Sequence, residues 1–227
     1  MGFFEIIAQY YQYFLRGTQT TIVVALFTVF FGAILGCAIA LMRLSHVKPL
    51  QWFSKLYITI IRGTPMLVQL YIVYYQLDFI PYPQGTLFGV DMQRAIPCMI
   101  ALSINSAAYI AEIIRAGIQA VDVGQTEAAR SCGMTASQAM RYIILPQAFK
   151  RIIPPLGNEF IAMLKDSSLV SVIGFEELTR SGQLIISETY GSLEIWTAVA
   201  ILYLIMTLSI TRLVGYIEKR FRISDAR

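Results

Sequence analysis

Two apolar segments of the sequence carry polar side chains at a regular spacing. Asn105 and Glu112 are seven residues apart in one segment, and Glu159 and Asp166 are seven residues apart in the other. Because seven residues make nearly two turns of an α-helix, each pair lies on one face of its helix. A charge near the centre of a bilayer costs about 2.5–3.5 kcal/mol on insertion scales, so such groups need a partner or a water-filled cavity.

A small polar ligand that carries an ammonium group and a carboxylate suits these groups. Its ammonium group needs acceptors, which Glu159 and Asp166 supply, and its carboxylate needs a donor, which Lys165 supplies. Asn105 offers both a donor and an acceptor. These four residues are therefore the candidate substrate-binding residues. The excess of acidic groups over one lysine favours a substrate with a cationic or amide side chain.

The same residues can instead hold a helix bundle together. In that interpretation Glu159 pairs with Arg151 or Lys165, and Glu112 pairs with Arg115. Lys165 directly precedes Asp166 and points about 100° away from it around the helix, so it meets a different neighbour. Both interpretations remain open from the sequence.

The composition places these segments in a membrane. The 227 residues are 56% hydrophobic and only 14% charged, whereas soluble domains carry about 25% charged residues. With about 20 apolar residues needed per span, we expect an all-α membrane protein with a single transmembrane domain over residues 1–227. Five spans are expected, at about residues 20–42, 53–79, 96–118, 152–173 and 195–216.

Three features lie around these spans. An aromatic-rich stretch before the first span, from Phe3 to Phe14, predicts a short interfacial helix. Within the second span, Arg62-Gly63-Thr64-Pro65 predicts a kink or an unwound turn, because proline removes a donor and glycine loosens the helix. After that span, Pro81-Tyr82-Pro83-Gln84-Gly85 predicts a loop.

The basic residues set the orientation. Thirteen of the 18 Lys and Arg residues fall on one side of the expected spans, in the loops that follow the first and third spans, in the C-terminal tail, or in the span ends next to them. Because cytoplasmic loops are enriched in Lys and Arg, we expect the N-terminus outside and the C-terminus in the cytoplasm. A net charge of +4 is then a topology signal, and no nucleic-acid partner is expected.

The loop between the third and fourth spans, about residues 119–146, is too polar to insert and rich in helix formers. We expect two short helices: one starting near Thr126, a break at Gly133, and a second capped by Thr135 toward Gln138. Its small residues allow another protein to approach closely, and Glu127 offers a charge for pairing. This composition fits a docking surface or an ordinary connector equally well.

At these positions the sequence resembles the type I ABC importer permeases. Glu127-Ala128-Ala129, Gly133 and the later Ile143, Leu145 and Pro146 match every fixed position of that family's EAA loop. Arg62-Gly63-Thr64-Pro65 and Asn105 to Glu112 resemble the branch that imports polar amino acids. The resemblance implies that Glu127, Ala128, Ala129 and Gly133 form a coupling helix that seats in a groove of an ATPase subunit.

The resemblance also implies partners. It predicts a dimer of ATP-binding cassette subunits, a second permease copy (identical rather than different), and an extracytoplasmic solute-binding protein that meets Glu176, Glu177, Glu188 and Glu194. The chain has no phosphate-binding G-x-x-x-x-G-K-[ST] loop, so ATP and Mg²⁺ are expected on the separate ATPase and no cofactor on this chain. The expected location is the lipid bilayer of a bacterial inner membrane, as a multi-pass protein.

Other classes of function fit less well. A membrane metalloprotease needs several metal ligands, whereas His46 is the only histidine and the three cysteines lie far apart, so no metal site and no enzymatic activity are expected. A serine-based membrane protease is compatible with the serines in the spans but leaves the EAA pattern unexplained. A gradient-driven carrier or a channel is the main alternative, since polar residues within spans suit it equally.

Overall fold

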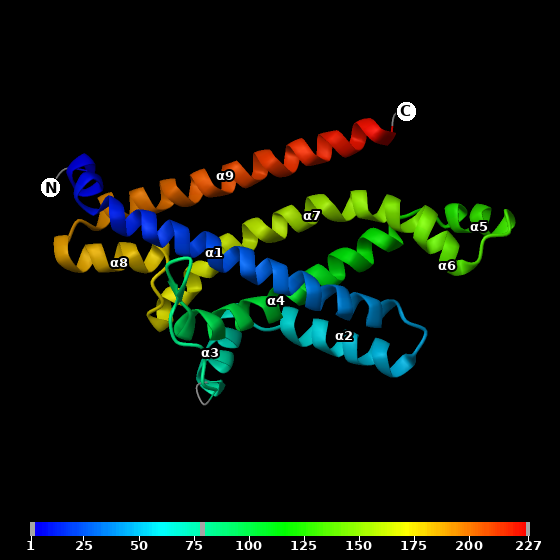
Figure 1. The fold of residues 1–227 in the computed structure, drawn as a ribbon, viewed down its shortest axis with the longest axis horizontal. Coiled ribbons are helices and arrows are strands. Elements are labelled where there is room, and N and C mark those ends of the chain that lie inside the picture. Colours follow the sequence, from blue (N-terminus) through cyan, green and yellow to red (C-terminus); the bar gives the residue numbers. More distant parts are fainter. Residues whose placement is uncertain (1–2, 78–79, 226–227) are drawn as a thin grey trace.

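A computed structural model describes residues 3–77 and 80–225 of the chain. The molecule is elongated, and almost all of its elements are helices that run along the long axis (Figure 1). In order along the chain they are α1 (Phe3–Leu44), α2 (Lys48–Arg62), α3 (Met66–Gln76), α4 (Met92–Gln119), α5 (Val123–Ser131), α6 (Ala136–Ala139), α7 (Leu145–Asp166), α8 (Leu178–Thr189) and α9 (Ser192–Asp225). A π-helical turn, Met140–Ile144, precedes α7, and a 3-10 helix, Ser167–Ile173, follows it.

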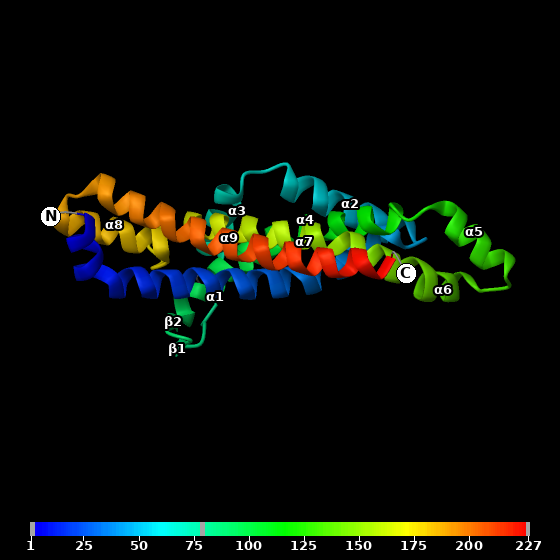
Figure 2. The same cartoon turned by 90° about the horizontal axis from the view of Figure 1, so that it is seen from above.

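Helix α1 is longer than the sequence analysis predicted. Its 42 residues include both the expected first span and the aromatic stretch before it, without a break in the helix. The first turns lie at an angle to the rest of α1 in both views (Figures 1 and 2). The prediction of a separate short helix is therefore wrong, because Ile6 and Phe14 are buried against the bundle and hold this segment in helical register with the span.

The second expected span is broken. Helices α2 and α3 meet at an angle of 106° across the break that Gly63, Thr64 and Pro65 make. Proline supplies the N-cap of α3 with an extended backbone, and the carbonyl of Thr59 accepts from the amide of Gly63 to close α2. The predicted kink is confirmed, and it is a sharp turn of the chain.

The loop after α3 contains a small hairpin that was not predicted. Strands β1 (Thr86–Leu87) and β2 (Val90–Asp91) pair antiparallel, with Thr86 opposite Asp91. Phe88 and Gly89 both have positive φ, as a tight two-residue hairpin turn requires. The side-chain amide of Gln19 donates to the Phe88 carbonyl at 2.8 Å and ties this hairpin to α1.

Helix α4 lies at the centre of the bundle, in contact with α1, α2, α3 and α7. In its most apolar stretch 67% of the residues are buried, against 22% in α9, which lies at the edge. A stripe of small residues on α1, including Gly32 and Gly36, faces α4. A Cβ at Gly36 would lie 2.9 Å from the Ala107 carbonyl oxygen, so glycine permits the close helix contact that membrane proteins favour.

Three helices in the described residues are long and apolar enough to cross a membrane: α1, α4 and α9. The bent pair α2 and α3 makes a fourth if it counts as one span. Helix α7 does not meet this criterion, although it covers most of the expected fourth span and begins seven residues earlier than 152. Its charged residues lower its hydropathy, and they include Glu159, Lys165 and Asp166 of the substrate-site prediction.

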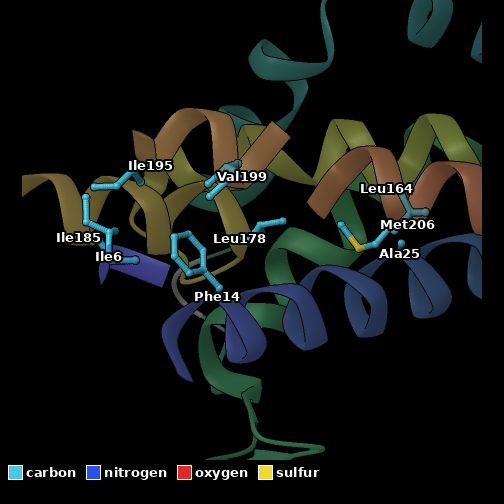
Figure 3. Close-up of a cluster of buried hydrophobic side chains, with 10 residues drawn as sticks. Ile6, Phe14, Ala25, Leu164, Leu178, Ile185, Ile195, Val199 and Met206 are labelled. Atoms are coloured by element: carbon cyan, nitrogen blue, oxygen red, sulfur yellow. The ribbon is translucent and has the colours of Figure 1, made fainter. Parts of the chain in front are cut away.

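The first turns of α1 pack with α8 and α9 at one end of the molecule. There Ile6, Ile185 and Ile195 form a cluster that continues through Phe14 and Leu178 toward α7 (Figure 3). At the opposite end, α5 and α6 extend beyond the other helices (Figures 1 and 2). The start of α2, with Lys48, lies toward this second end, so basic residues from separate loops gather there (Figure 1).

Candidate functional site: the protruding loop and the α4–α7 seam

The protruding loop begins with a well-capped helix. Asp122 is the N-cap of α5, and its carboxylate accepts from the Gly124 amide at 2.7 Å. The helix thus starts at Val123 and not near Thr126 as predicted, because the aspartate satisfies the free amides of the first turn earlier in the chain.

The end of α5 explains the glycine of the EAA pattern. Gly133 has a φ of 83°, its amide donates to the Arg130 carbonyl, and the Met134 amide donates to the Ala129 carbonyl. These two bonds form a Schellman motif, which needs a left-handed residue at this position. The arginine side chain of Arg130 adds a bond to the Met134 carbonyl at 2.8 Å. Gly133 therefore sets the direction in which the loop turns back.

The second short helix forms as predicted. Thr135 caps α6 through a capping box: its hydroxyl accepts from the Gln138 amide at 3.2 Å, and the Gln138 side chain accepts from the Thr135 amide at 2.8 Å. The helical backbone then continues through the π-helical turn into α7. The loop and α7 are therefore joined by an unbroken helical backbone.

The residues of the loop differ in exposure. Glu127, Ala128 and Gly133 are exposed, whereas Ala129 and Ala139 are buried where α5 packs against α6 and the π-helical turn. The loop therefore presents Glu127 and Ala128 outward. Ala129 stabilises the loop from inside.

Helices α4 and α7 run antiparallel and meet along a seam. The Ser106 hydroxyl donates to the Glu159 carboxylate at 2.8 Å, and 11 residues further along α4, Gly117 lies against Ile152. Glu159 is buried at this seam, with 7% of its surface exposed. Neither Arg151 nor Lys165 forms an ion pair with it among the described residues, so that part of the bundle-holding interpretation is wrong.

The other pair of that interpretation is confirmed. Glu112 and Arg115 form a two-pronged ion pair on one side of α4, with both guanidinium contacts going to the same carboxylate. Because this carboxylate is satisfied within its own helix, it does not join Asn105 in a common site.

Asn105 turns toward the break in the second span. Its side-chain amide donates to the Gln69 side-chain oxygen at 2.9 Å, and both residues are buried. The Gln69 amide in turn donates to the Ile61 carbonyl at 2.7 Å and to the Thr64 carbonyl at 3.0 Å. We call Gln69 and Asn105 the polar clamp. It satisfies backbone carbonyls that the break between α2 and α3 leaves without helical partners.

Replacing Gln69 with leucine is expected to lower the melting temperature of the purified protein by several degrees. The substitution leaves buried polar groups unsatisfied, at about 1–3 kcal/mol each, and about 2–4 °C follows per kcal/mol in a chain of this size. A double variant with Asn105→Leu should recover part of the loss, because the Asn105 amide is then also removed. Equal melting temperatures for wild type and Gln69→Leu would refute the role of the clamp.

Lys165 and Asp166 lie at the end of α7. Lys165 is exposed and lines a cavity of about 320 Å³ with Ser168, Thr179, Trp196 and Tyr203. Asp166 is half-buried on a different side of the helix and does not line this cavity. The structure therefore brings Glu159 to the α4–α7 seam, Lys165 to a hydroxyl-rich cavity, and Asn105 to the polar clamp. It does not gather all four candidates around one space.

The burial of Glu177 was not predicted. Glu177 was expected on an outer loop that meets a solute-binding protein, but its side chain is fully buried as the N-cap of α8. Its carboxylate accepts from the amides of Thr179 and Arg180 and from the Tyr203 hydroxyl, each at 2.8 Å. Burial raises the pKa of this carboxyl, and these hydrogen bonds act to lower it. No sequence pattern distinguishes it from Glu176, which is exposed.

In the described part of the chain, no three His, Cys, Asp or Glu side chains come together to hold a metal ion. The distinguishing features are thus the protruding loop and the polar groups along α4 and α7.

A bundle of long apolar helices with a loop that protrudes at one end is typical of a membrane protein (Figure 1). Residues 28–223 match the family described as the binding-protein-dependent transport system inner membrane component, and the chain belongs to this family. Its members include permease proteins of ABC transporters.

Two relatives come from Bacillus subtilis (strain 168). The probable glutamine ABC transporter permease protein GlnM is 39% identical over 210 residues, which cover 92% of this chain and 94% of that protein. The arginine transport system permease protein ArtQ is 36% identical over 213 residues, which cover 94% of each protein.

Solved structures agree with this assignment. A crystal structure of an amino acid ABC transporter with histidines superposes with a TM-score of 0.87 and 46% identity, covering 97% of this chain and 99% of that one. The MetNI methionine ABC transporter, in an inward-facing conformation, has a TM-score of 0.76 at 19% identity over 92% of this chain and 96% of that one. This second likeness shows that the folds agree.

Proposed function

We propose that this chain is the permease subunit of an ATP-driven importer for polar amino acids, and that its protruding loop seats on a separate ATPase. The observation that carries the proposal is the loop itself: α5 and α6 extend beyond the bundle with Glu127 and Ala128 exposed (Figure 1). The amino acid assignment is supported by the names of relatives that cover nearly the whole chain, among them glutamine and arginine permeases.

The proposed arrangement has five spans in the inner membrane of a bacterium. The bent pair α2 and α3 serves as the second span, and α7 serves as the fourth, with its polar face along the substrate path. The N-terminus is outside and the loop and C-terminus are cytoplasmic, which the gathering of basic residues near the loop supports. A solute-binding protein then meets the opposite end, where Glu176 and Glu188 are exposed and Glu177 is not.

Two copies of the permease are expected in the complex, because five helices enclose a path poorly and one loop serves one ATPase subunit. ATP and Mg²⁺ belong to the ATPase pair. Closure of that pair would push α5 and α6, and the continuous helix into α7 would transmit the movement to the α4–α7 seam. Glu159, Lys165, Asp166 and Asn105 remain the proposed substrate contacts, with Asn105 acting partly through the polar clamp.

Reconstitution tests this function. The permease is purified with its ATPase and binding protein, inserted into liposomes, and supplied with radiolabelled glutamine, arginine or histidine. We expect uptake that requires ATP, the ATPase subunit and the binding protein. Uptake by the permease alone along an ion gradient would support the carrier alternative and refute the proposal.

The substitution Asp166→Asn tests the substrate contacts. We expect the complex to assemble normally and uptake to fall at least about tenfold, because one charge-assisted hydrogen bond is worth about 1.5–3 kcal/mol. Copurification with the ATPase and the initial uptake rate are the measurements. Glu218→Gln, which removes an exposed carboxylate near the end of α9, is the matched control. Normal uptake by the Asp166 variant would remove this residue from the site.

A further inference from the structure

A groove runs along one side of α4. None of the proposed substrate contacts lines this groove. It has a volume of about 390 Å³, within the range of small-molecule sites. On α4 it is lined by Tyr109, Glu112, Ile113, Ala116, Gly117 and Ala120. This spacing marks one face of the helix over about three turns, so the groove is a lengthwise channel and not a local dent.

The groove leads from the loop end of α4 toward the middle of the bundle. Ala120 is the C-cap of α4, next to the protruding loop, and Tyr109 lies about 16 Å further in at 1.5 Å per residue. Arg62, from the broken end of α2, lies at the inner end with its guanidinium carbon 5.1 Å from the centre of the Tyr109 ring. At the outer end Arg151 of α7 donates to the Ala120 carbonyl.

The charge of the groove is unbalanced. Glu112, midway along it, is already held by Arg115. Arg62 is exposed, makes no ion pair with any carboxylate among residues 3–77 and 80–225, and lies over the Tyr109 ring, while its charge acts at a distance on Glu112. The guanidinium therefore has hydrogen-bond donors available for an anion that enters the groove.

The fold holds Arg62 in position before a ligand binds. Gln69 holds the carbonyls of Ile61 and Thr64, the residues on either side of the break, and Asn105 holds Gln69 on α4. The Tyr109 ring then orients the guanidinium. A guanidinium held in place loses little freedom when it binds a carboxylate through two parallel hydrogen bonds.

We propose that this groove is a second amino acid site, open to the cytoplasm, in which Arg62 binds the carboxylate of the transported amino acid. The apolar wall of Ile113, Ala116 and Pro155 accommodates the aliphatic part of the ligand, and Glu112 keeps lone pairs for its ammonium group. The inference rests on the proposed function. Because the site opens on the cytoplasmic side, internal amino acid occupies it and opposes further import.

The test uses the complete transporter in proteoliposomes preloaded with increasing concentrations of the unlabelled substrate. The initial rate of ATP-driven uptake is divided by the rate of the same variant with no internal substrate. We expect wild type to be inhibited by internal substrate, and Arg62→Gln to need at least about a tenfold higher internal concentration, the effect of about 1.4 kcal/mol. Arg62→Lys should retain part of the inhibition, and Lys55→Gln, an exposed neutralisation on the same helix, should retain all of it.

A lipid phosphate is the other anion that Arg62 would accept. The experiment is therefore run in phosphatidylcholine alone and in phosphatidylcholine with phosphatidylglycerol. A change in Arg62→Gln that depends on phosphatidylglycerol but not on internal substrate would overturn the amino acid site. Equal inhibition of wild type and Arg62→Gln, or none in wild type, would overturn it as well. If the wild-type transporter shows no ATP-driven uptake at all, the proposed function is refuted, and this inference is refuted with it.

Discussion

Gly133→Val is expected to reduce ATP-coupled uptake at least about tenfold, whereas Gly133→Asn retains most of it. Gly133 has a φ of 83°, and a side chain placed there would meet no atom within 4 Å. Space is therefore available, and only the backbone conformation resists substitution. Left-handed geometry costs about 1–2 kcal/mol in an ordinary residue and more in a β-branched one, while asparagine tolerates it.

The strain acts on the proposed docking surface. Without the left-handed turn, the two Schellman bonds that redirect the chain after α5 are lost, and Glu127 no longer holds its position relative to α6. The measurements are uptake, substrate-stimulated ATP hydrolysis and copurification of the ATPase subunit. Equal losses in the valine and asparagine variants would show that side-chain size matters here and not backbone geometry.

Charge reversal at Glu127 tests the proposed docking surface without changing the backbone turn at Gly133. The Glu127 side chain is exposed and forms no hydrogen bond or ion pair among the described residues, and the Glu127 backbone carbonyl accepts from the Ser131 hydroxyl at 2.9 Å. Glu127→Lys should therefore leave folding intact while weakening ATPase binding. Glu218→Lys, a charge reversal on an exposed part of α9, is its control. If Glu127→Lys copurifies with the ATPase as wild type does, the loop is a connector and not a docking surface.

Glu177→Ala is expected to give the largest loss of stability among single substitutions outside the loop. The carboxylate caps α8 by accepting hydrogen bonds from two backbone amides, and it accepts a third from the Tyr203 hydroxyl of α9. The Thr21 hydroxyl of α1 lies 3.5 Å away. Three helices thus depend on one buried side chain. Losing two charge-assisted hydrogen bonds costs at least about 3 kcal/mol, which corresponds to a fall of about 6–12 °C in melting temperature.

Matched variants identify the cause of this loss. Glu176→Ala, at the exposed neighbouring position, should leave the melting temperature unchanged within error. Tyr203→Phe removes one of the donors and should have an intermediate effect. Thermal unfolding of the purified variants in detergent is the measurement. A small effect of Glu177→Ala together with a large effect of Glu176→Ala would contradict the assignment.

Local signals in the sequence predicted the loop well. The break at Gly133 and the capping box of Thr135 and Gln138 depend on residues no more than five apart, so their geometry follows from residue type and spacing. The start of α5 was displaced because Asp122 competes successfully with Thr126 as a cap. The kink at Pro65 was likewise local, but its angle of 106° depends on Gln69 and Asn105, which come from different helices.

The sequence by itself determined that this protein lies in a membrane and that a polar, helical loop joins the third and fourth apolar segments. Hydropathy, charge and spacing along the chain are sufficient for these features. Only the tertiary structure decided which polar side chains meet. Asn105 serves the clamp, Glu159 accepts from Ser106, and Glu177 is buried while Glu176 is not. Such partners lie many residues apart, and helix packing alone brings them within hydrogen-bonding distance.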